Sequence, residues 1–64
     1  MCLSNVYLEE NGEQTLVFKE AATVSRNGNE LTFTNILGIP KSFEGQIEKI
    51  DFLENKIIIK KNEK

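Results

Sequence analysis

Two Asn-Gly dipeptides divide the first half of this sequence into short segments and constrain its fold more than any other feature. Asn11-Gly12 and Asn27-Gly28 are typical of hairpin turns, because Asn and Gly tolerate the positive φ angles that tight turns need. Leu31 and Phe33 alternate with polar residues directly after the second dipeptide. Apolar residues at every second position indicate strands, since an amphipathic helix would repeat them every three or four residues. The chain is therefore predicted to be all-β.

The same pattern predicts about six short antiparallel strands. We expect them at residues 2–8, 15–19, 22–26, 31–33, 46–53 and 56–60. The spacing of three between Ile47 and Ile50 breaks the alternation and indicates a β-bulge near Glu48-Lys49. Pro40 has no backbone N–H to donate, so we expect an irregular edge or loop around it. Short strands separated by turns at this spacing predict a small SH3/Sm-like barrel or a sandwich.

The chain is also short, which limits how it can be stabilised. Its 64 residues form one domain, residues 1–64, and a domain of this size buries only about 60% of its unfolded surface. One cysteine and no histidine exclude an internal disulfide and a zinc finger with four Cys/His ligands. Self-association is the remaining common means of support, so we expect a homodimer.

Three consecutive isoleucines at residues 57–59 raise a packing question. They cannot all face one core from a pleated strand, because successive side chains point to opposite faces. Either a second subunit covers Ile58, or the strand lies between two layers. An interaction protein that docks a partner on the Ile58 face is one alternative function.

Charge and segment composition exclude several classes of protein. Eight basic and ten acidic residues give a net charge of −2, which does not call for a polyanionic partner. The sequence has neither a recognisable signal peptide nor an apolar run of the roughly 20 residues that span a membrane. A single unpaired cysteine without an export signal is typical of a reducing compartment. We therefore expect a cytoplasmic protein with no membrane segment.

The sequence contains few residues that could act in catalysis. There is no histidine, the one aspartate is Asp51, and no Gly-rich phosphate loop is present. The chain is predicted not to be an enzyme. RNA binding is the alternative to consider for a small barrel, and it needs exposed aromatic residues on a basic surface. Only Tyr7, Phe43 and Phe52 are candidates, since Phe18 falls on an apolar face, as Phe33 does.

Cys2 is the residue whose position suggests chemistry. A lone cysteine is usually a small buried apolar residue. At position 2, however, its thiolate, its own backbone nitrogen and the α-amine of Met1 can close adjacent chelate rings. If Met1 is removed, the thiolate and the amine belong to the same residue. Nitrogen and thiolate donors suit Ni(II) or Cu(II), and a two-fold dimer could bring two Cys2 thiolates to one ion.

Motifs along nearly the whole chain resemble one family. They are the Met1-Cys2 opening, Val6-Tyr7-Leu8, Asn27-Gly28-Asn29, Phe43-Glu44-Gly45, Ile50-Asp51-Phe52-Leu53 and Ile57-Ile58-Ile59. The chain resembles the CooT-type nickel-binding proteins, small proteins long labelled as predicted RNA-binding proteins. The resemblance implies a cytoplasmic homodimer that binds Ni(II) at Cys2, with Met1 beside it. It also implies a metallochaperone or sensor linked to the maturation of a nickel enzyme, carbon monoxide dehydrogenase.

Overall fold

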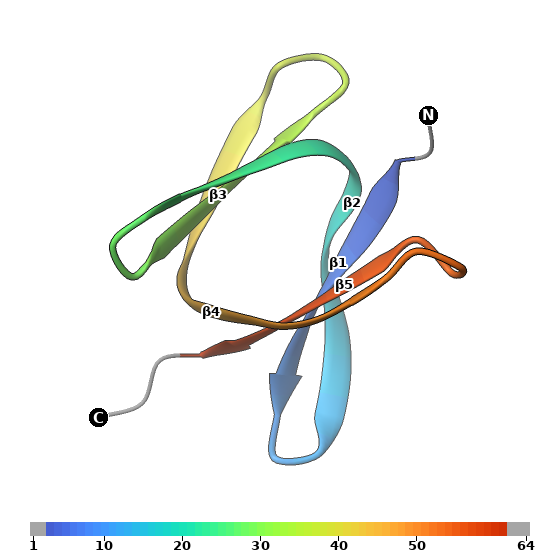
Figure 1. The fold of residues 1–64 in the computed structure, drawn as a ribbon, viewed down its shortest axis with the longest axis vertical. Helices are drawn as coiled ribbons and strands as arrows, with labels where there is room; N and C mark the ends of the chain where they lie inside the picture. Colours follow the sequence, from blue (N-terminus) through green and yellow to red (C-terminus); the bar gives the residue numbers. More distant parts are fainter. Residues whose placement is uncertain (1–2, 62–64) are drawn as a thin grey trace.

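The structure, a computed structural model, describes residues 3–61, and these form five β-strands. The strands are β1 (Ser4–Glu10), β2 (Glu13–Asn27), β3 (Glu30–Asn35), β4 (Pro40–Asp51) and β5 (Lys56–Lys61). They follow one another around a closed barrel in chain order (Figure 1). Consecutive strands are antiparallel, and β1 and β5 close the barrel as a parallel pair. The predicted small all-β barrel is confirmed. No helix long and apolar enough to cross a membrane occurs in this part of the chain.

The strand count is five where the sequence predicted about six, because β2 is one continuous strand. Residues 15–19 and 22–26 were expected to form two strands. Instead Glu20 takes a φ of 57°, and β2 bends there without ending. Ala21 then pairs with both Ser4 of β1 and Asn35 of β3. Figure 1 shows β2 curving from the side of β1 to the side of β3.

The segment around Pro40 is also more regular than predicted. Pro40 begins β4 and pairs with Thr34, so residues 40–45 are regular strand. The first position of a strand is one of the few that proline tolerates, because its missing N–H need not bond there. Only residues 36–39 form an irregular loop. The predicted bulge is confirmed, since the pairing of β4 with β5 shifts between Ile47 and Lys49.

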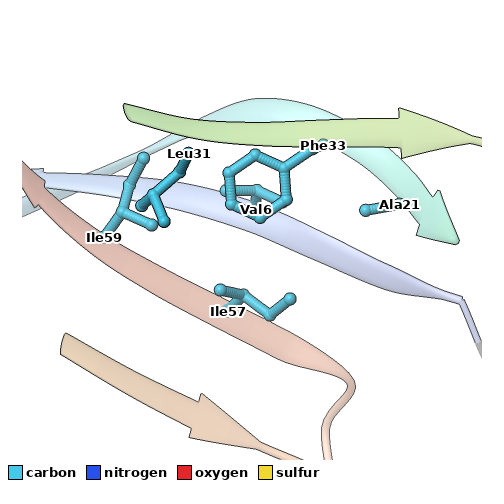
Figure 2. Packing of buried hydrophobic residues seen from close by; sticks show 6 residues of the cluster. All are labelled: Val6, Ala21, Leu31, Phe33, Ile57 and Ile59. Carbon is cyan, nitrogen blue, oxygen red and sulfur yellow. The ribbon is translucent and has the colours of Figure 1, made fainter. Parts of the chain in front are cut away.

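The core lies inside the barrel and draws on four strands. Its buried members are Val6, Ala21, Leu31, Phe33, Ile57 and Ile59 (Figure 2). The Phe33 ring lies between the rings of Phe18 and Phe43, with centroid distances of 6.3 and 5.8 Å. The alternation after the second Asn-Gly dipeptide therefore marks the centre of the core.

The single chain already covers Ile58. Its side chain is 6% exposed, although Ile57 and Ile59 supply the core from the same strand. In the sheet it lies between Tyr7 of β1 and Lys49 of β4. A docking face centred on Ile58 is therefore wrong, since almost none of that side chain is accessible.

Gly45 lies where the backbones of β4 and β5 approach each other closely. A Cβ added there would overlap the carbonyl oxygen of Lys60 and lie 3.1 Å from its carbonyl carbon. We expect Gly45→Ala to lower the free energy of unfolding by about 3 kcal/mol, the upper end of typical overpacking costs. Gly28→Ala is the control, because its φ of +66° is strained for alanine but its added Cβ has nothing within 4 Å. Its cost is about 1 kcal/mol. Urea unfolding of both variants compares them, and equal losses would contradict the close approach at Gly45.

Candidate functional site

The predicted metal ligands Met1 and Cys2 lie outside the described residues. The described chain begins at Leu3, and β1 follows directly from Ser4. What the structure defines is therefore the end of the barrel at which the predicted ligand segment joins the fold. The surroundings of the start of β1 are the relevant geometry.

Asn5 ties the start of β1 to its neighbours on both sides. Its backbone N–H donates to the carbonyl oxygen of Asn55 at 2.9 Å, in the turn between β4 and β5. Its side-chain Oδ1 accepts a hydrogen bond from the N–H of Glu20 at 3.1 Å, at the bend of β2. Glu20 has a left-handed φ, and its N–H bonds to a side chain where a regular strand would bond to the neighbouring backbone. The Asn5 side chain supplies the acceptor that this N–H needs. The start of β1 is thus anchored to the β4–β5 turn on one side and to the bend of β2 on the other.

The loop between β3 and β4 lies at the same end. Asn35 pairs with Ala21, which itself pairs with Ser4, so the loop starts two strands away from the start of β1. The Asn35 Oδ1 accepts hydrogen bonds from the N–H groups of Leu37 and Ile39, at 2.9 and 3.0 Å. One asparagine side chain therefore holds the loop in shape.

The turn between β4 and β5 is organised in the same way by Asp51. Its Oδ1 accepts hydrogen bonds from the N–H groups of Leu53 and Glu54, at 3.0 and 3.1 Å. Glu54 also forms an ion pair with Lys56 at 4.0 Å. The one aspartate in the sequence thus serves as a turn-forming acceptor.

Both connections expose large apolar side chains toward solvent. They are Ile36 at 68%, Leu37 at 79%, Ile39 at 55%, Phe52 at 83% and Leu53 at 95% exposed, and together we name them the apolar rim. Figure 1 shows the start of β1 between the two connections. Sequence reasoning missed this surface, although Ile36-Leu37 beside Asn35 and Gly38 was a signal. Loops lie on the surface and are usually polar, so apolar residues between turn-forming residues are expected to be exposed.

Among residues 3–61, no three His, Cys, Asp or Glu side chains come together in a way that could hold a metal ion. The predicted ligands at residues 1 and 2 are therefore the donors to consider at this end of the barrel. The thiolate and the two nitrogens available there form a donor set that suits Ni(II), and oxygen-seeking Mg(II) or Ca(II) would not favour it. The chemistry of the donors fits the predicted metal.

The part of the chain that the structure describes has no group of exposed aromatic residues of the kind that RNA binding needs. Phe33 is buried, while Phe18 and Phe43 pack against the core. The Lys56 ammonium lies 5.1 Å from the centroid of the Tyr7 ring, so one face of that ring is occupied. Among the aromatic residues in 3–61, Phe52 is the one that is largely exposed, at 83%, whereas single-strand binders stack successive bases on several aromatics.

An open depression of about 320 Å³ lies at the tip of the β2–β3 hairpin, away from the start of β1. It is lined by Arg26, Gly28, Asn29, Gly45, Gln46 and Ile47. Arg26 is its one charged side chain, so it contains no pair of groups for acid/base catalysis.

Comparison with known proteins gives three consistent matches. A family described as "CO dehydrogenase accessory protein CooT" matches residues 1–60. The protein MJ1551 of Methanocaldococcus jannaschii is 41% identical over 59 residues, which are 92% of this chain and 96% of that protein. The crystal structure of a protein assigned as CooT from Carboxydothermus hydrogenoformans superposes with a TM-score of 0.89, over 97% of this chain and all of that chain. At 14% identity, the last match shows a shared fold.

Proposed function

This chain belongs to the CooT family of CO dehydrogenase accessory proteins, and from that premise we propose that it binds Ni(II) for a nickel enzyme. The observation that carries the proposal is a family match that begins at Met1 and so includes Cys2. An accessory protein to carbon monoxide dehydrogenase has a nickel enzyme as its client. Metallochaperone and nickel sensor are the two roles that one bound ion would serve.

The proposed ligands are the Cys2 thiolate and the nitrogens beside it. With Met1 retained, the Met1 amine and the Cys2 backbone nitrogen complete adjacent chelate rings with the thiolate. With Met1 removed, the Cys2 amine takes their place. We propose one Ni(II) per homodimer, held by both copies of Cys2, because a two-fold axis brings identical residues together.

The proposed role is one of binding and transfer in the cytoplasm, where an unpaired thiol stays reduced. Catalysis has no part in it. Asp51, the one aspartate, holds its own turn through the N–H groups of Leu53 and Glu54. Titration of Ni(II) into the wild type and into Cys2→Ser tests the proposal, since only the first retains the thiolate.

Nickel affinity is expected to fall as the pH falls. A free cysteine has a pKa of about 8.5 and an α-amine about 7.7–8.0, so both donors are protonated in acid and must lose protons to bind. We expect at least a roughly tenfold weaker affinity at pH 6 than at pH 7. Competition titrations at several pH values measure the affinity, and calorimetry in buffers of different ionisation enthalpy counts the released protons. An affinity that is constant from pH 6 to pH 8 would contradict thiolate and amine ligation.

A further inference from the structure

The depression at the tip of the β2–β3 hairpin lies where β4 leaves β3 and turns toward β5. Glu30 pairs with Glu44 at the end of the β3–β4 ladder, and next to it the N–H of Gly45 donates to the carbonyl oxygen of Asn29 at 2.9 Å. From Gly45 on, β4 pairs with β5, and Figure 1 shows its bend beside this hairpin. The depression therefore lies between a hairpin turn and an edge of β4 that no longer has β3 beside it.

Arg26 lines this depression from the inner face of the sheet. It pairs with Leu31, which is fully buried, and cross-strand partners share one face. Glu30 precedes Leu31, so its side chain lies on the opposite face, together with that of its partner Glu44. The strand register thus separates the Arg26 guanidinium from these two carboxylates.

Arg26 forms no ion pair with a carboxylate among residues 3–61. The ion pairs in this part of the chain join Glu54 to Lys56 and Glu10 to Lys61. Arginine stays protonated at neutral pH, and its guanidinium carries five N–H donors and no acceptor. Its planar shape matches a carboxylate, which it can bind through two parallel hydrogen bonds. An anion is therefore the ligand that this side chain is best suited to hold.

The rest of the lining adds neutral polar groups and one apolar wall. Asn29 and Gln46 have amide side chains, and Ile47 is the large apolar member. Alternate residues of an antiparallel strand direct their backbone groups to the same edge, so we expect the N–H of Ile47 to point the same way as that of Gly45. Gly45 finds an acceptor in Asn29, but in the described chain β3 has no residue opposite Ile47. A backbone donor is therefore available in the same depression as the guanidinium.

We propose that this depression binds a small carboxylate, with the Arg26 guanidinium as the group that recognises it. One guanidinium balances the single charge of a carboxylate, whereas a phosphate group carries about −1.5 to −2 near pH 7 and is usually held by several cations. The amides of Asn29 and Gln46 can bond to the polar edge of the ligand, and Ile47 can contact a short alkyl chain. A volume of about 320 Å³ is at the small end of ligand pockets, which favours a molecule of few atoms.

A titration with sodium butyrate, followed by the backbone amide signals in NMR spectra, tests the site. We expect saturable shifts at Gly28, Gly45 and Gln46, with a dissociation constant on the order of 1 mM. Butyramide has the same shape without the charge and should cause no saturable shift. Arg26→Gln should weaken butyrate binding roughly tenfold or more, because it removes hydrogen bonds to a charged group. Lys19→Gln is the matched control, since it removes one positive charge from an exposed position of β2 outside the depression.

Three results would overturn the site. The first is the lack of saturable shifts with butyrate, and the second is equal affinity in Arg26→Gln and the wild type. The third is an equal loss in Arg26→Gln and Lys19→Gln, because net charge alone would then explain the effect. Inorganic phosphate is the competing anion, and tighter binding of phosphate than of butyrate would contradict a carboxylate site. Circular dichroism checks that both variants keep their strands, and none of these results depends on nickel binding.

Discussion

The Cys2→Ser variant is expected to lose Ni(II) affinity by more than the roughly 10- to 100-fold that loss of an outer-shell partner costs a metal site. A thiolate is a soft, charged donor, whereas a serine hydroxyl stays neutral near pH 7 and offers a hard oxygen. If two copies of Cys2 share one ion, the substitution removes two ligands at once. A competition titration measures the affinity, and the wild type should saturate near one Ni(II) per two chains.

A carboxylate near the start of β1 is the main competitor for this role. Glu54 precedes Asn55, which bonds directly to Asn5, and Glu54 forms an ion pair with Lys56. Glu54→Gln is therefore the matched control, and it should bind Ni(II) as the wild type does. Equal affinities for the wild type and Cys2→Ser, with a loss in Glu54→Gln, would transfer the ligand role from the thiolate to the carboxylate.

Features encoded by local backbone chemistry could be predicted from the sequence. Asn11 and Gly12 take φ values of 53° and 80°, and Gly28 takes 66°, as the turns at the two dipeptides require. The spacing of Ile47 and Ile50 likewise indicated the bulge in β4, because a break in alternation is visible within a few residues. These signals depend on no distant part of the chain.

Features that depend on distant partners could not be predicted. Nothing near Glu20 signals a left-handed φ, and the partner that satisfies its N–H is Asn5, fifteen residues earlier. β2 continues through this residue and goes on to pair with β3. Ile58 is similar, because its cover comes from neighbouring strands that the local pattern does not identify.

The same distinction between local and distant signals applies to the functional region. Cys2 could be singled out because its donors are adjacent along the chain, and its role as a ligand stays a prediction. Phe52 was considered as an exposed aromatic for RNA, and it is indeed 83% exposed. The place of Leu37 and Ile39 in the fold was out of reach of a sequence pattern, because the pairing of β2 with both β1 and β3 decides where their loop lies.

Phe33→Ala is expected to have the largest effect on stability. Phe33 is fully buried between the rings of Phe18 and Phe43, and truncation of such a residue costs about 3–5 kcal/mol. A folded chain of 64 residues has roughly 3–10 kcal/mol of stability in total, at about 0.05–0.15 kcal/mol per residue. The variant should therefore be largely unfolded, or unfold at a greatly lowered temperature, as circular dichroism on heating will show.

Phe52→Ala makes the same chemical change at a side chain that is 83% exposed, and it is the matched control for the loss of core packing. Because that side chain buries little surface within its own chain, we expect Phe52→Ala to lower the melting temperature far less than Phe33→Ala does. Equal losses from the two variants would contradict the position of Phe33 at the centre of the core.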